Sequence, residues 1–179
     1  MSVAAAISDD VEPVDAAFAT VGSIALQGLR LAQPTVGERF VVIGLGLIGL
    51  LAVQLLQAQG CTVLGIDPNP DRRRLAEGFG AATVSSSDDV LQAAAAHSRG
   101  RGVDGVLVCA STTSSEPIHQ AAQMCRQRGR IAVLNKIDGL WDGIRSAAEI
   151  DAEIAGQVRT TAEILQLDAR HVYPVSAQK

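Results

Sequence analysis

One glycine-rich turn constrains this chain more than any other feature. Residues 39–43 are an apolar β-branched run and residues 47–59 an apolar helical run, with glycine between them at Gly44, Gly46 and Gly49. This is the spacing G-x-G-x-x-G between a predicted strand and a predicted helix, a context that makes the motif specific. Gly44 allows a tight turn, Gly46 lets the backbone approach a pyrophosphate, and Gly49 lets the helix lie close to the strand. The turn predicts a dinucleotide-binding βαβ unit; glycines that serve packing alone are the alternative.

The rest of the chain alternates strands with helices, as βαβ units do. Further strands are predicted at residues 62–66, 83–84, 105–109, 130–134 and 171–175. Helices are predicted from Pro13 to the break at Pro34, at 71–78, from a cap at Asp88 to about His97, at 115–126 and at 147–165. We therefore expect an α/β fold, a doubly wound Rossmann-like parallel sheet of about six strands in order 3-2-1-4-5-6, in three α/β/α layers. Residues 1–12 are predicted to be an N-terminal tail, and residues 13–179 a single domain.

An acidic residue, Asp67, follows the second predicted strand. In a dinucleotide-binding sheet, a carboxylate at this place can accept hydrogen bonds from both hydroxyls of the adenosine ribose. Its charge would repel a 2′-phosphate, which favours NAD over NADP. Arg72, Arg73 and Arg74 follow on the next helix and can hold a 2′-phosphate, so NADP is the second choice. A plain turn residue before Pro68 is the alternative interpretation of Asp67.

Composition excludes several function classes. The formal net charge of −4 argues against a nucleic-acid partner, because such proteins normally present a basic face. The three cysteines and three histidines lack C-x-x-C or H-x₃-H spacing, so no metal site is predicted. Residues 41–66 carry no charge, yet their glycines and glutamines argue against a membrane helix. The N-terminus lacks the basic region of a signal peptide, and a cytoplasmic protein is expected.

Residues 10–134 resemble the cofactor domain of medium-chain dehydrogenases/reductases, of the zinc-type alcohol dehydrogenase-like kind in bacterial two-domain oxidoreductases. The resemblance lies in the run from Asp15 to Ala76 (DAAFAT to DRRRLA), in VDGVLVCAS at residues 103–111 and in GRIAVL at residues 129–134. It implies an NAD(H)-binding oxidoreductase domain. The cofactor contacts that it implies are Gly44, Gly46, Leu47, Ile48, Gly49, Asp67, Arg72, Cys109, Ala110 and Ser111.

The same resemblance implies a catalytic domain that would precede this region and that this sequence does not include. The zinc-ligand cysteines, the His-Glu pair and the four-cysteine lobe of the family are also missing, so no zinc is expected. No catalytic residue is predicted, and the chain is expected to have little or no turnover alone. A catalytic domain or a second copy of the chain is the expected protein partner, and a dinucleotide the expected ligand.

The segment after residue 134 resembles a different family. N-K-x-D follows one predicted strand, and S-A-x-K follows the last one. Together they resemble the guanine-recognition segment of bacterial dynamin-like GTPases. The guanine contacts that this resemblance implies are Asn135, Lys136, Asp138, Ser176, Ala177 and Lys179. Because no G-x-x-x-x-G-K-[ST] occurs, GTP hydrolysis is not expected.

The two resemblances meet near residues 131–134, so the chain is interpreted as a chimera of dehydrogenase-like residues 13–134 and GTPase-like residues 135–179. Three functions follow as hypotheses. The first is an NAD(H)-binding Rossmann domain of an oxidoreductase. The second is a structural chimera, engineered or recombined, without a tight ligand. The third is a weak guanine-nucleotide binder without GTPase activity.

Overall fold

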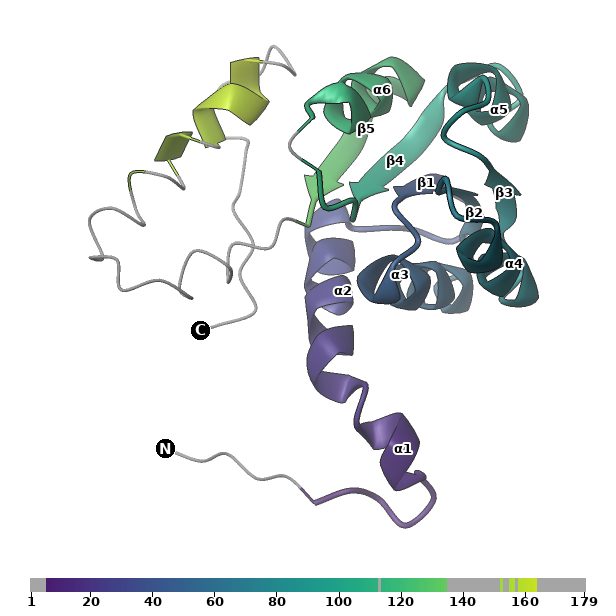
Figure 1. The fold of residues 1–179 in the computed structure, drawn as a ribbon, viewed down its shortest axis with the longest axis vertical. Helices are drawn as coiled ribbons and strands as arrows, with labels where there is room; N and C mark the ends of the chain where they lie inside the picture. Colours follow the sequence, from purple (N-terminus) through teal and green to yellow (C-terminus); the bar gives the residue numbers. More distant parts are fainter. Residues whose placement is uncertain (1–5, 113, 135–151, 153–154, 157, 164–179) are drawn as a thin grey trace.

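The computed structural model describes residues 6–112, 114–134, 152, 155–156 and 158–163. Its centre is a parallel sheet with the strands in the order β3-β2-β1-β4-β5 (Figure 1). The strands are β1 (Arg39–Ile43), β2 (Thr62–Ile66), β3 (Ala82–Val84), β4 (Val103–Val108) and β5 (Cys125–Val133). The helices are α1 (Pro13–Ala16), α2 (Ala19–Ala32), α3 (Leu47–Ala58), α4 (Pro70–Gly78), α5 (Val90–His97) and α6 (Glu116–Met124).

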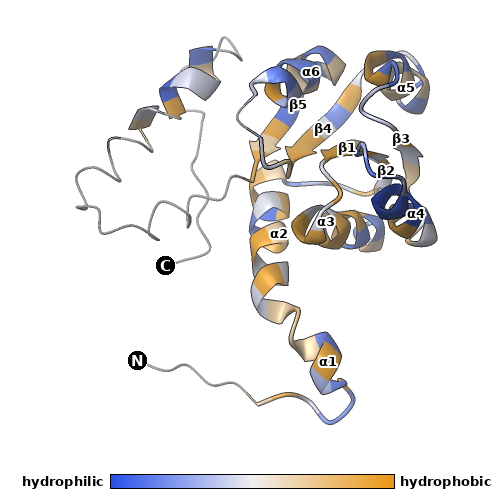
Figure 2. Ribbon diagram, in the orientation of Figure 1, coloured by the Kyte–Doolittle hydropathy of each residue, from blue (hydrophilic) through white to orange (hydrophobic). Residues whose placement is uncertain are grey.

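Helices cover both faces of the sheet, which gives the predicted three layers. Along β1, Phe40 and Val42 face the core under α2, α3 and α4, whereas Val41 and Ile43 face the core under α5 and α6. This alternation is the two-residue period of a strand that is buried on both sides. The arrowhead ends of β4 and β5 are coloured as apolar and α4 as strongly hydrophilic (Figure 2).

The predicted doubly wound order is confirmed for the five strands that the structure describes. The bounds of β1 and β2 match those predicted from the sequence, and α3 ends one residue earlier than predicted. The predicted sixth strand at residues 171–175 lies outside the described residues. Of the predicted helix at 147–165, residues 152, 155–156 and 158–163 are described, and they are helical.

The predicted helix at residues 115–126 was too long. The α6 helix ends at Met124, and Cys125 has extended backbone (φ −69°, ψ 140°) because it pairs with Val103 of β4. The register then shifts, and Gly105 pairs with Arg130. Residues 126–129 of β5 therefore stand opposite the single residue Asp104 of β4, an irregularity that includes Arg128 with a left-handed φ of 62°.

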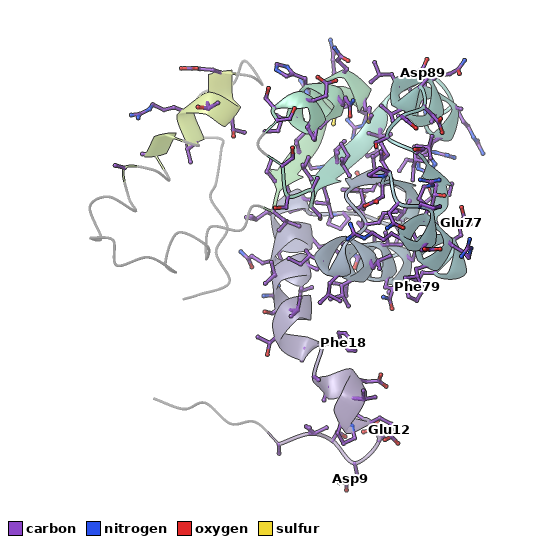
Figure 3. The ribbon with its side chains drawn as sticks, viewed as in Figure 1. Asp9, Glu12, Phe18, Glu77, Phe79 and Asp89 are labelled. Carbon is purple, nitrogen blue, oxygen red and sulfur yellow. The ribbon has the colours of Figure 1, made fainter. Side chains whose placement is uncertain are left out.

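Two predicted helix starts also differ from the structure. The residue that caps α5 is Asp89 rather than Asp88, and its carboxylate accepts a hydrogen bond from the Gln92 N–H at 2.9 Å. The helix predicted from Pro13 is interrupted between α1 and α2, where the Phe18 N–H donates to the Asp15 carbonyl, three residues back. Phe18 lies at this junction, away from the sheet, and is 46% exposed (Figure 3).

The α2 helix reaches the sheet through its second half and projects beyond it at the other end (Figure 1). At Gly28 an added Cβ would lie 2.8 Å from the side chain of Leu134, so the absence of a side chain lets the two elements pack. Of the helices described, none is both long and apolar enough to span a membrane.

Candidate dinucleotide site

Two of the three glycines in the turn are required by packing. Gly44 has φ +92°, and a Cβ there would lie 2.6 Å from the backbone nitrogen of Ala110, just past β4. A Cβ at Gly49 would lie 1.9 Å from the carbonyl oxygen of Gly44. The turn therefore packs on the end of β4, and the first turn of α3 packs directly on the turn.

Gly46 behaves differently. It precedes α3 with an ordinary extended conformation (φ −69°, ψ −171°). A Cβ added there would meet no atom of the described residues within 4 Å. Packing among the described residues therefore does not explain glycine at this position, whereas the approach of a ligand to the backbone would.

The start of α3 offers hydrogen-bond donors. No side chain of the described residues caps it, and the N–H groups of a helix's first turn have no partner within the helix. Leu47, the first residue of the helix, is 49% exposed, so the start of α3 reaches the surface. Free N–H groups at the positive end of the helix dipole suit a phosphate.

Asp67 lies at the carboxyl end of β2, next to the glycine-rich turn. Its side chain is 3% exposed, and each carboxylate oxygen accepts one backbone N–H at 2.8 Å, Oδ2 from Leu45 and Oδ1 from Asn69. Arg72 Nη1 lies 3.7 Å from Oδ2, with the arginine side chain 53% exposed. Asp67 and Arg72 thus lie together, as expected, but the carboxylate is more buried than a ribose contact alone would suggest.

The three consecutive arginines of α4 have different partners. Arg73 Nη1 donates to the carbonyls of Asp67 and Pro68, at 2.7 and 2.9 Å. Arg74 pairs with Asp71 at 2.9 Å on the surface. Arg72 is therefore the arginine that lies beside the Asp67 carboxylate.

Sequence reasoning missed the role of Asn69. Its side chain accepts hydrogen bonds from the N–H groups of Asp71 and Arg72, at 2.8 and 3.2 Å, and so caps α4. An Asn-Pro pair at the start of a polar helix is the signal that would have indicated it, since Pro70 occupies the first helical position.

The end of β4 forms another side of the site. The Cys109 N–H donates to the Ile43 carbonyl at 2.8 Å, which carries the β1–β4 pairing one step beyond the strands. Burial raises the pKa of the Cys109 thiol to about 12, so it stays protonated and is a poor nucleophile. Ala110 packs on Gly44, and Ser111 is exposed. The structure thus places Cys109 and Ala110 beside the turn.

The residues predicted to contact guanine lie outside the part of the chain that the structure describes. They are Asn135, Lys136, Asp138, Ser176, Ala177 and Lys179.

Comparison with known families decides the affiliation. A family model described as zinc-binding dehydrogenase matches residues 48–141, slightly more than half of the chain. The chain belongs to the zinc-binding dehydrogenase family. The match begins at the first turn of α3 and runs past the crossover expected near residues 131–134. Nothing in the comparisons supports a GTPase-like segment or a chimera.

Individual relatives agree with this affiliation. The chain is 36% identical to L-threonine 3-dehydrogenase of Bacillus subtilis (strain 168), over 70% of this chain and 36% of that one. It is 29% identical to an alcohol dehydrogenase of Rhizobium meliloti (strain 1021), over 81% of this chain and 44% of that one. The chain spans about a third to a half of the length of these relatives.

Solved dehydrogenase structures share the fold. An alcohol dehydrogenase from Thermus sp. ATN1 is 28% identical with a TM-score of 0.66, over 71% of this chain and 37% of that one. A protein from Sinorhizobium meliloti 1021, solved bound to NADP, is 34% identical with a TM-score of 0.66, over 72% of this chain and 39% of that one.

The family name raises the question of zinc. Within the part of the chain that the structure describes, no group of three or more His, Cys, Asp or Glu side chains could hold a metal ion. The described residues therefore do not fit a zinc site.

Proposed function

We propose that this chain is the NAD(H)-binding domain of an alcohol dehydrogenase-like oxidoreductase. Gly46 carries the proposal, because a side chain there would meet none of the described residues, and no side chain among them caps the start of α3 beside it. In this arrangement the N–H groups from Gly46 onward, at the start of α3, bind the pyrophosphate, because those of Gly44 and Leu45 already donate to the Ile66 carbonyl and to Asp67. The residues that would hold it are Gly44, Gly46, Leu47, Ile48 and Gly49.

The adenosine ribose would lie beside Asp67 and Arg72. We propose that NAD is preferred over NADP, because the Asp67 carboxylate places a negative charge where a 2′-phosphate would lie. The Arg72 guanidinium, 3.7 Å from that carboxylate, offsets part of this charge and limits the preference. The relative from Sinorhizobium meliloti 1021 that was solved with NADP keeps NADP as the second candidate.

The nicotinamide half would extend toward Cys109, Ala110 and Ser111, at the end of β4. A nicotinamide cofactor supplies hydride transfer when it is bound. Hydride transfer also needs an acid, a base or a metal beside the ring, and we assign none of the described residues to that role. We therefore propose that turnover requires a catalytic domain or a second copy of the chain, and that the substrate is chosen there.

A titration with NADH, followed by nicotinamide fluorescence, tests this function. Saturable binding that ADP-ribose displaces supports it, whereas a folded chain that binds no NADH would overturn it and leave the hypothesis of a domain without a tight ligand. Displacement of NADH by GDP, with a measurable GDP affinity, would support the guanine-nucleotide alternative that the N-K-x-D and S-A-x-K segments suggest.

A further inference from the structure

The Asp67 carboxylate is hydrogen-bonded to the backbone of the glycine-rich turn. Where β1 ends, the Gly44 N–H still donates to the Ile66 carbonyl of β2 at 2.8 Å. The next N–H, that of Leu45, donates to the Asp67 carboxylate instead of to a backbone carbonyl, also at 2.8 Å. A side chain therefore takes over the strand pairing at the point where the chain leaves the sheet and enters the turn.

The Leu45 side chain is fixed as well. It is fully buried, and a Cβ at Gly65 would lie 3.0 Å from both of its methyl carbons. Leu45 thus packs on β2 through its side chain and bonds to Asp67 through its N–H. The backbone of the turn between Gly44 and Gly46 has little freedom while both contacts hold.

The other carboxylate oxygen of Asp67 reaches the next helix. It accepts the Asn69 N–H, and the Asn69 side chain in turn caps the first turn of α4, which carries Arg72. One buried carboxylate therefore connects the turn at the start of α3 with the start of α4. These are the two places where the proposed pyrophosphate and ribose contacts lie.

We propose that Asp67 is a positioning residue for the pyrophosphate turn, in addition to any bond that it makes to the ribose. This inference rests on the proposed dinucleotide site. Removing the carboxylate leaves the buried Leu45 N–H without its acceptor, so the turn loses its set conformation. Binding of the diphosphate then weakens even for a ligand that has no ribose hydroxyls.

The test compares ADP with 2′,3′-dideoxy-ADP by calorimetric titration of the whole chain. Both ligands carry the diphosphate, but only ADP can bond to a carboxylate through its ribose hydroxyls. We expect Asp67→Ala to weaken both ligands by at least about fivefold, and the loss for dideoxy-ADP is the part caused by positioning. Asp67→Asn keeps one acceptor oxygen and should recover part of the dideoxy-ADP affinity.

Asp71→Ala is the matched control. It removes the same charge four residues away, from an exposed carboxylate that pairs with Arg74 and accepts no backbone N–H in the described structure. Its affinity for both ligands should stay within about twofold of the parent. Full dideoxy-ADP affinity in both Asp67 variants would show that Asp67 acts on the ribose alone, and would overturn the proposal.

Amide hydrogen exchange at Leu45 gives a measurement without ligand. The exchange should be at least about tenfold faster in Asp67→Asn or Asp67→Ala than in Asp71→Ala. If the parent chain binds neither NADH nor ADP, the proposed function fails, while faster exchange at Leu45 still supports the role of Asp67 in the turn. Unchanged exchange at Leu45 in a folded Asp67 variant overturns that role. If Asp67→Ala does not fold, the measurement is made on Asp67→Asn.

Discussion

The guanidinium of Arg130 lies over the ring of Phe40, with Cζ 5.6 Å from the ring centroid. The same guanidinium donates to the Gln33 carbonyl at 2.7 Å and pairs with Glu38. Below the ring, Gly105 of β4 is the cross-strand partner of Phe40. A cation, an aromatic ring and a glycine thus join β5, β1 and β4 at one level of the sheet.

Gly105→Ala tests this packing. A Cβ at Gly105 would lie 2.3 Å from Cε1 of Phe40, whose ring is fully buried. We expect the free energy of unfolding to fall by about 1–3 kcal/mol, the usual cost of overpacking a core. Urea denaturation measures it. Gly22→Ala is the control, since a Cβ there meets no described atom within 4 Å and its stability should not fall.

Arg130→Met should destabilise the fold because it removes the polar contacts of Arg130. The substitution keeps much of the apolar stem over Phe40 but removes the donors to Gln33 and Glu38. Because hydrogen bonds to charged groups contribute about 1.5–3 kcal/mol, we expect a loss in that range in the free energy of unfolding. Arg74→Met, at an arginine that is 76% exposed, should change the stability by less than about 0.5 kcal/mol. Equal losses in the two variants would contradict the argument.

The free energy of unfolding should fall at low pH because the Asp104 carboxylate becomes protonated. Burial alone would raise the pKa of this carboxyl, but hydrogen bonds from the Arg39 N–H and from Arg126 hold the pKa below its ordinary value of 3.8. A folded-state pKa below the unfolded one contributes stability above about pH 4, and that stability is lost as the pH falls through the folded pKa. Asp104→Asn should therefore lose less stability than the parent between pH 5 and pH 3, as urea titrations at each pH would show.

Gly46→Val tests the open space beside α3. A branched side chain there occupies the place where a phosphate would approach, so NADH should bind at least tenfold more weakly, a change of about 1.4 kcal/mol. Gly22→Val is the control at a glycine with similar free space but far from the turn, and it should bind NADH as the parent does. Unchanged NADH affinity in Gly46→Val would exclude this site.

ADP-ribose should bind almost as tightly as NAD⁺. The contacts that we propose at the glycine-rich turn, Asp67 and Arg72 all lie on the pyrophosphate and the adenosine ribose. Calorimetric titrations with the two ligands measure the difference directly. A much higher affinity for NAD⁺ would reveal a nicotinamide site that these contacts do not include.

The boundaries of β1 and β2 and the place of the glycine-rich turn could be predicted from the sequence alone. Each strand is a short apolar run, and the spacing of Gly44, Gly46 and Gly49 belongs to a local strand–turn–helix unit. Repetition of such units leads to the doubly wound strand order, because crossovers between parallel strands are right-handed. The ligand role of Gly46 was also predicted in this way, and it stays a prediction.

The tertiary structure decided where distant segments meet. Cys125 is strand rather than helix because it pairs with Val103. Arg126 donates a hydrogen bond to Asp104, 22 residues earlier in the chain. The bond between Asp67 and Leu45 also spans 22 residues. Such contacts depend on the register between strands and on which side chains meet across them, and a local pattern of apolar and polar residues carries neither. The sequence by itself therefore determined the elements and their order, whereas packing between strands decided the contacts that hold the turn.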